Sequence, residues 1–366
     1  MRLSRRAWLA LLPAAAAAAP GADDDEPVRA GRVLRFPRDH GAHPRARIEW
    51  WYATGWLDGP EGPIGFQVTF FRSRTGLAEK LGSRFAPRQL LFAHAAISEI
   101  AARRHLQAQQ AARWSGDPDA PAAVAATHDT GLRLGRWLMG RDGEPGGGRY
   151  RAQVGGGDAP FDLQLTLQAT QPLLLQGDAG HSRKGPQPQQ ASHYYSLPQL
   201  AAQALLQLGG RRLELRGRAW LDHEWSDELM PADAVGWDWA GINLADGGAL
   251  TAFRLRTREG APLWAGGSHR SGDGRLRIFG PADVRFTALR HWASPATLAR
   301  YPVAWRLETP AGEHQLQALL DAQELDGSAS TGAVYWEGLS ELRDDGGRAI
   351  GRGYLEMTGY ARPLTL

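Results

Sequence analysis

The densest mixture of polar and aromatic residues in the chain is the run Arg218-Ala219-Trp220-Leu221-Asp222-His223-Glu224-Trp225-Ser226. If this run is a strand, alternation places His223 and Trp225 on one face and Asp222 and Glu224 on the other. We expect the face with two carboxylates to meet solvent or a salt-bridged rim. A histidine beside an indole can orient a water molecule next to a developing positive charge. The alternative for His223 is a purely structural role.

Three carboxylates stand next to aromatic residues, in Glu49-Trp50-Trp51-Tyr52, Trp237-Asp238-Trp239 and Trp336-Glu337. A carboxyl group desolvated by aromatic walls has a raised pKa, so it can donate a proton near neutral pH. We prefer Asp238 as the acid because its flanking rings would supply both desolvation and cation stabilisation. Alternation, however, places Asp238 on the face opposite those two rings. The alternative for each carboxylate is an ion pair with one of the 40 arginines.

Tryptophan is frequent, with 14 in the chain, and several are clustered. Large rings commonly fill the interior of small barrels, which is the plain explanation for any single one. A cavity walled by indole faces would instead bind apolar or polyene ligands. The predicted catalytic residues are His223, Trp225 and Asp238. The predicted ligand-binding residues are Glu49, Trp50, Trp51, Tyr52, Trp237, Trp239, Trp336 and Glu337.

Other chemistry finds little support in the sequence. The chain has no cysteine, which excludes disulfides, thiolate metal sites and cysteine nucleophiles. No Gly-x-Ser-x-Gly elbow, Walker loop or His-Glu-x-x-His motif occurs. His40 and His43 are two potential metal ligands in a predicted loop, but nothing nearby in the sequence completes a site. We therefore predict neither a metal nor a cofactor.

Short runs with period-two alternation predict the elements that hold these residues. Residues 66–70 and 161–167 place apolar side chains on one face and polar ones on the other, and glycine-bearing turns separate such runs. This pattern is typical of antiparallel barrels or sandwiches. Residues 177–190 are rich in Gly, Pro, Gln and Arg, so we expect a surface loop there.

A hairpin pattern occurs twice in the chain. Residues 51–59 and 237–247 each begin with a tryptophan strand and end at an Asp-Gly turn of the type that closes hairpins. The second copy is two residues longer, yet the match favours duplication of a β unit. We therefore predict two lipocalin-like antiparallel β-barrel domains in tandem, at residues 33–226 and 227–366.

The first residues resemble an export signal. Residues 1–22 combine Arg5-Arg6 with an alanine- and leucine-rich run, which is typical of a twin-arginine signal peptide, and residues 23–32 form a linker. Removing Arg2, Arg5 and Arg6 from 42 basic residues leaves 39 against 39 acidic ones, which argues against nucleic acid as a partner. We expect a periplasmic or secreted protein that meets an inner-membrane export or ABC-transporter system. No sequence signal bears on its oligomeric state.

The motifs together resemble those of the lipocalin-like family that contains carotenoid 1,2-hydratase (hydroxyneurosporene synthase) and the secreted AttH-like proteins. The resemblance covers about residues 36 to 361. It rests on the motifs already quoted and on residues 65–72, 193–196, 335–338 and 353–360. It implies two lipocalin-like barrels and cofactor-free hydration of an isolated double bond. It also implies that a histidine and a tryptophan two residues apart belong to the active site, which His223 and Trp225 match.

The leading hypothesis is a hydratase-like lyase acting on a small hydrophobic, carotenoid- or isoprenoid-like ligand. In it, Asp238 protonates an alkene, tryptophan faces stabilise the carbocation, and a water oriented by His223 captures it. The main alternative is a non-catalytic periplasmic carrier of a lipid or another apolar ligand. A secreted hydrolase is a third reading, weakened by the lack of a recognisable nucleophile or metal site.

Overall fold

The computed structural model describes residues 27–77, 79–83, 86–117, 119 and 122–364. The predicted signal peptide and the first residues of the linker lie outside them. Within the described residues the fold is built of strands, with one short 3-10 helix, η2 (Arg38–His40). No helix of the described part has the length and apolar character needed to cross a bilayer.

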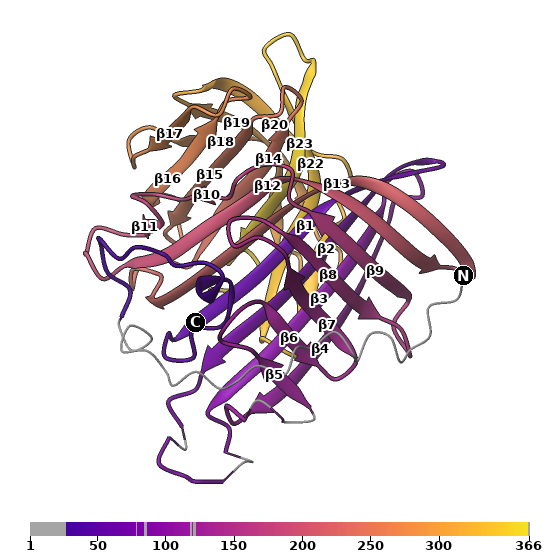
Figure 1. The fold of residues 1–366 in the computed structure, drawn as a ribbon. Helices are drawn as coiled ribbons and strands as arrows, with labels where there is room; N and C mark the ends of the chain where they lie inside the picture. The colour runs from indigo at the N-terminus through magenta and orange to yellow at the C-terminus, as the bar shows by residue number, and fades with distance from the viewer. Residues whose placement is uncertain (1–26, 78, 84–85, 118, 120–121, 365–366) are drawn as a thin grey trace.

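The first lobe is a 13-stranded antiparallel sheet, drawn from indigo to pink in Figure 1. Its main path runs β4-β3-β2-β1-β13-β12-β9-β8-β7-β6-β5, and the end strands β4 and β5 lie in contact, so the sheet curls into a nearly closed barrel. The strands are β1 (Ile48–Gly59), β2 (Gly62–Arg74), β3 (Gln89–Glu99), β4 (Arg104–Trp114), β5 (Ala123–Ala125), β6 (Gly131–Leu134), β7 (Trp137–Asp142), β8 (Arg149–Gly155), β9 (Phe161–Gln168), β10 (Leu174–Leu175), β11 (His181–Arg183), β12 (Ala191–Leu208) and β13 (Arg211–Glu228).

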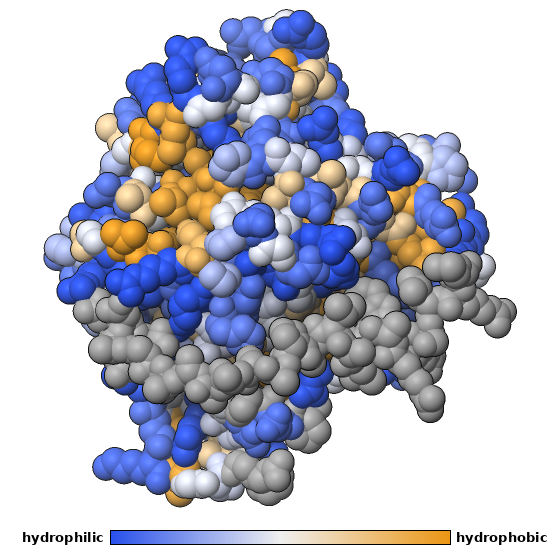
Figure 2. Space-filling view, viewed as in Figure 1, coloured by the Kyte–Doolittle hydropathy of each residue, from blue (hydrophilic) through white to orange (hydrophobic). Residues whose placement is uncertain are grey.

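The second lobe is a 10-stranded antiparallel sheet with the path β17-β16-β15-β14-β23-β22-β20-β19-β18, while β21 pairs with β22. Figure 2 shows apolar side chains gathered over β15 and β16 on the side of this lobe that faces the viewer. The strands are β14 (Gly236–Leu244), β15 (Ala249–Arg256), β16 (Pro262–Arg270), β17 (Leu276–Phe279), β18 (Arg285–Ala293), β19 (Arg300–Thr309), β20 (Gly312–Ala318), β21 (Glu324–Gly327), β22 (Ala333–Arg343) and β23 (Ala349–Thr358).

The two sheets share one strand order. In each, the first four strands follow one another outwards, and the first strand also pairs with the last, as β1 with β13 and β14 with β23. The first sheet ends at Glu228 and the second begins at Gly236. The predicted all-β class with two antiparallel β units is confirmed.

Three apolar clusters stabilise this arrangement. One fills the first lobe and one fills the second. A third lies between them and includes Tyr52 and Trp220 from the first lobe with Trp239, Phe253 and Tyr354 from the second. Strands β1 and β13 are therefore buried on both faces, which explains why residues 219–226 are buried without alternation.

Candidate functional site between the lobes

A cavity of about 240 Å³ lies where the two lobes meet. Strands β1, β2 and β13 line it from the first lobe, and β14, β15, β22 and β23 line it from the second. The surface that its walls expose is mostly apolar, as expected of a ligand site, although seven of the lining residues have acidic or basic side chains. Six of the predicted ligand-binding residues line this cavity, namely Glu49, Trp50, Tyr52, Trp237, Trp239 and Glu337.

Aromatic rings from the two lobes meet at this cavity. The rings of Trp50 and Trp237 stack with centroids 6.5 Å apart, and Tyr52 meets Trp239 edge-on at 5.5 Å. Trp50 and Tyr52 alternate on β1, as Trp237 and Trp239 do on β14, so each pair lies on one strand face. Aromatic rings from both halves therefore converge at the cavity.

Two glutamates stand directly opposite each other in the cavity wall. Glu337 on β22 and Glu356 on β23 are register partners; the Glu337 side chain is buried and that of Glu356 is half-buried. Burial and then the charge of Glu356 raise the pKa of Glu337 well above its usual value. Burial raises the pKa of Glu356 to about 8. Two carboxyl groups that face each other on neighbouring strands cannot both ionise readily, so the pair holds a proton near neutral pH.

The first lobe carries a single carboxylate at the matching position. Asp222 pairs with Tyr52 across β13 and β1, as Glu356 pairs with Trp239 across β23 and β14. Opposite Asp222 stands Ser196, where the second lobe has Glu337.

Asp222 is held by donors instead of by a second acid. It accepts hydrogen bonds from Ser196 (2.6 Å), Trp220 (2.7 Å) and Tyr194 (2.8 Å). Burial nevertheless raises its pKa to about 7. A second acidic side chain with a pKa near neutral therefore lines the same cavity.

An ion pair completes the polar lining. Lys184 Nζ lies 2.9 Å from Glu224 Oε1, and both side chains are buried. The surface loop expected at residues 177–190 was right only in part. Residues 186–189 are exposed, but β11 pairs with β12 and Lys184 reaches the cavity. The solvent-facing rim expected for Asp222 and Glu224 was also wrong. Their face of β13 meets the second lobe instead of water.

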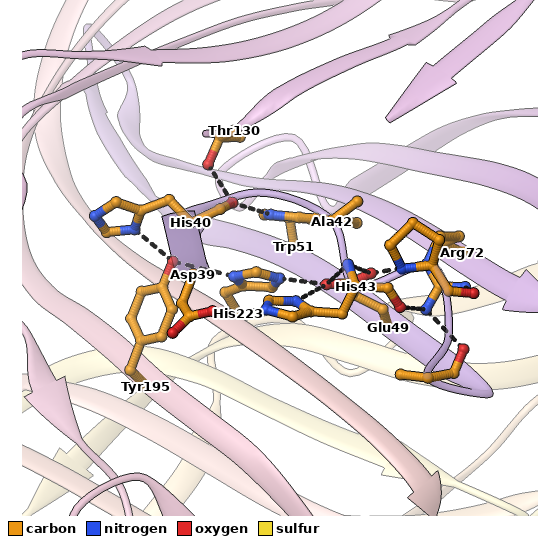
Figure 3. A network of polar contacts seen from close by, with 12 residues as sticks. Asp39, His40, Ala42, His43, Glu49, Trp51, Arg72, Thr130, Tyr195 and His223 are labelled. Atoms are coloured by element: carbon orange, nitrogen blue, oxygen red, sulfur yellow. Dashed lines mark hydrogen bonds and ion pairs between the residues drawn. The ribbon is translucent and has the colours of Figure 1, made fainter. Parts of the chain in front are cut away.

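His223 lies on the other face of β13, inside the first lobe, and does not line the cavity. Its Nε2 lies 2.9 Å from Glu49 Oε1, its Nδ1 lies 3.1 Å from the Tyr195 hydroxyl, and Trp51 stacks on its ring at 4.5 Å (Figure 3). Burial lowers the pKa of His223, opposed by its hydrogen bond to Glu49. His223 is therefore a neutral histidine within a dense polar network.

Glu49 is the centre of that network. Oε2 accepts a hydrogen bond from Arg72 Nε at 2.7 Å, and Oε1 lies 2.7 Å from His43 Nδ1 (Figure 3). Burial alone would raise the pKa of Glu49, but Arg72 and then His43 hold it well below its usual value. Arg72 also donates to the carbonyl oxygens of His43 and Ala46, which ties residues 43–46 to the barrel.

His43, Glu49 and His223 also place three potential metal-ligating atoms within 4.8 Å of one another. This donor set is one that zinc accepts. Arg72 already balances the charge of Glu49, and Arg32 balances that of Asp39, the other partner of His43. A divalent ion would therefore bring unbalanced charge into a buried site. The geometry favours a hydrogen-bonded network here.

The remaining predicted residues lie in the cores of the two lobes. Trp225 stacks on His43 at 3.7 Å, and Trp336 donates from Nε1 to the Asp321 carbonyl. Asp238 is 0% exposed and accepts hydrogen bonds from Arg254 (2.7 Å) and Tyr360 (2.8 Å). The structure does not bring Asp238 together with His223 or with the cavity. The catalytic roles of His223, Trp225 and Asp238 therefore stay predictions.

Sequence reasoning missed the cavity residues Asp222, Glu224, Lys184 and Glu356. One signal could have found two of them. The runs Arg218-Ala219-Trp220-Leu221-Asp222 and Arg352-Gly353-Tyr354-Leu355-Glu356 share the order arginine, any residue, aromatic, leucine, acid. This second repeat marks the last strand of each sheet and ends at a cavity carboxylate in both.

Comparison with known protein families identifies the family to which the chain belongs. A model of the AttH-like family matches residues 27–360, nearly the whole described chain. The chain belongs to the AttH-like family. An AttH-like protein from Nitrosomonas europaea, known from its crystal structure, is 45% identical, covers 92% of this chain and 99% of its own, and superposes with a TM-score of 0.82. A search of curated proteins gave no match.

More distant solved structures share the fold of this AttH-like protein. Kievitone hydratase from Nectria haematococca is 14% identical, covers 90% of this chain and 94% of its own, and has a TM-score of 0.67. CghA bound to Sch210972 is 14% identical, covers 86% and 89%, and has a TM-score of 0.52. At these identities the likeness extends to the two-lobed β architecture alone.

Proposed function

We propose that this AttH-like protein is a hydratase-like enzyme that adds water to an isolated double bond of an apolar ligand in the interlobe cavity. The observation that carries the proposal is the pair Glu337 and Glu356, which stand opposite each other in a cavity with aromatic walls, Glu337 buried and Glu356 half-buried. A carboxyl group that keeps its proton near neutral pH is the acid that such a reaction needs. The naming of one distant relative as a hydratase is consistent with this chemistry.

The proposed reaction balances without a cofactor. The protonated member of the pair gives its proton to one alkene carbon, the π bond breaks, and a carbocation forms on the other carbon. The ring faces of Trp50, Trp237 and Trp239 stabilise this positive charge. Water then forms the new C–O bond and gives a proton back to the ionised carboxylate, so the pair again holds one proton.

The substrate is proposed to be isoprenoid-like. The cavity volume of about 240 Å³ lies just below the usual range for drug-sized ligands, so it fits a short terpenoid or one end of a longer polyene. A carotenoid substrate and action outside the cytoplasm, after export directed by residues 1–22, are parts of the same proposal.

The test is hydration of short isoprenoid alkenes, followed by mass spectrometry in isotopically labelled water. Glu356→Gln and Glu337→Gln should each lower turnover about 10²–10⁴-fold, the usual contribution of a positioned acid or base. Glu313→Gln, which changes an exposed glutamate of the same lobe, serves as the matched control. Full activity in both cavity variants would remove the pair from the mechanism. An intact ligand that co-purifies and is never converted would favour the carrier.

A further inference from the structure

We infer that the interlobe cavity selects apolar molecules whose polar end is cationic or uncharged and rejects those that end in a carboxylate or phosphate. The inference rests on the proposed function in taking this cavity as the ligand site. It goes further by naming the charge of the ligand. It also applies to a ligand that is bound and never converted.

The charges that line the cavity are the first argument. Five carboxyl groups line it, from Glu49, Asp222, Glu224, Glu337 and Glu356, against two basic side chains, Lys184 and Arg72. Among the described residues, therefore, acidic groups outnumber basic ones in the lining.

Neither basic side chain is available to an anion. Lys184 Nζ lies 2.9 Å from Glu224, and Arg72 Nε lies 2.7 Å from Glu49. Arg72 also donates to Gln89 and to three backbone carbonyls. An anionic ligand would have to break one of these buried ion pairs, which is costly because it leaves a charge without a partner.

The aromatic walls also favour a cationic ligand over an anionic one. Indole faces carry negative electrostatic potential, so Trp50, Trp237 and Trp239 attract a cation and repel an anion. The cavity already holds two contacts between a cation and an aromatic ring. Lys184 Nζ lies 4.3 Å from the centre of the Phe253 ring and 4.8 Å from that of Tyr194. A ligand ammonium group would find the same kind of surface a short distance away.

The glutamate pair offers a place for that charge. Among the described residues no basic side chain forms a salt bridge with Glu337 or Glu356, so their charge is suppressed by protonation instead of by a counter-ion. A bound cation would take the place of that proton. Cation binding should therefore release a proton and strengthen as the pH rises towards 8, the range in which Glu356 titrates.

Other ionisable groups surround the glutamate pair, but they do not reverse the predicted strengthening of cation binding with rising pH. The tyrosines among them have pKa values raised above their usual range and stay neutral, and the basic groups are paired as described. These neighbours are Glu49 and Tyr52 on β1, Arg72 on β2, Lys184 before β12, Tyr194 on β12, Asp222 and Glu224 on β13, Tyr335 on β22 and Tyr354 on β23.

The experiment uses three probes that differ only in their polar end: naphthylmethylamine, naphthylmethanol and naphthoate. Binding to the full-length protein is measured by calorimetry and by quenching of tryptophan fluorescence. At pH 8 the amine should bind about tenfold more tightly than the alcohol, and naphthoate most weakly, since one unit of pKa corresponds to a tenfold change in affinity. From pH 6 to 8 the amine should gain about tenfold while the alcohol stays constant.

Two variants distinguish a specific loss of cation preference from general damage to the fold. Glu356→Gln should remove most of the preference for the amine and keep the affinity for the alcohol, whereas Glu313→Gln should change neither. The inference is overturned if naphthoate binds as tightly as the amine, if the preference survives in Glu356→Gln, or if none of the probes binds. Hydration is not measured here, so a lack of turnover would count against the proposed function alone.

Discussion

Glu337 and Glu356 show how a cross-strand pair can be tuned by what surrounds it. Facing carboxylates on neighbouring strands repel each other when both are ionised. In the first lobe the corresponding position is Ser196, which donates a hydrogen bond to Asp222. The replacement of a donor by a second acid turns a hydrogen-bonded carboxylate into a pair that retains a proton.

This pair should give the folded protein a distinctive pH dependence. An unfolded glutamate loses its proton near pH 4.5, whereas folded Glu356 keeps it to about pH 8, so raising the pH through this window favours the unfolded chain. Buried His40 and His193, with pKa values lowered to about 3, have the opposite effect, but only up to pH 6.5. From pH 6.5 to 8 the free energy of unfolding should therefore fall.

Glu356→Gln should flatten this dependence in urea unfolding measured at several pH values. Asp222, whose pKa is raised to about 7, contributes to the lower part of the same window and remains in the variant. A wild-type protein whose stability is constant from pH 6.5 to 8 would contradict the assignment.

Glu49 predicts an effect on stability of a different kind. Glu49→Gln leaves the buried Arg72 without its counter-charge, so the free energy of unfolding should fall by about 3–5 kcal/mol. Glu61→Gln, at a side chain 70% exposed, is the control and should stay within about 0.5 kcal/mol. Denaturant titration measures both. Equal stability of the two variants would show that Arg72 is held by its other partners.

At the residue scale the sequence predicted which side chains of β13 share a face, but not which of its two faces lines the cavity. Alternation correctly separated His223 from Asp222. Choosing between the faces required knowing that both are buried, since one packs inside the first lobe and the other against the second. Rules that assign polar faces to solvent fail on such a strand.

The backbones of strands β1 and β13, which both line the site, lie close together at Gly217. A Cβ on Gly217 would lie 1.8 Å from the Trp56 carbonyl oxygen, so only glycine fits beside β1 at this point. This contact keeps the register in which Tyr52 stands opposite Asp222. The hairpin repeat was readable from the sequence, whereas this close approach was not, because it joins residues about 160 positions apart.

Gly217→Ala should therefore destabilise the protein by about 1–3 kcal/mol, the usual cost of overpacking. Gly82→Ala provides the control, because a Cβ there would meet no atom within 4 Å. Urea unfolding compares the two variants. A neutral Gly217→Ala would mean that the two strands can separate without loss.

At the scale of the molecule, the third apolar cluster joins the lobes into one cooperative unit. Tyr52, Trp220 and Trp239 pack together across the boundary. We expect a single calorimetric unfolding transition for the native protein. Trp239→Ala should lower the stability by about 3–5 kcal/mol and separate the transition into two. Two transitions in the unchanged protein would contradict this coupling.

The aromatic contacts across the cavity join matching positions. Trp50 meets Trp237 and Tyr52 meets Trp239, so each residue touches its own counterpart. Self-complementary contact of this kind is the mark of a twofold interface between identical subunits. The two lobes thus meet across the cavity as the halves of an approximate twofold interface would. The symmetry stops at the acids, because Asp222 faces Ser196 in one half and Glu356 faces Glu337 in the other.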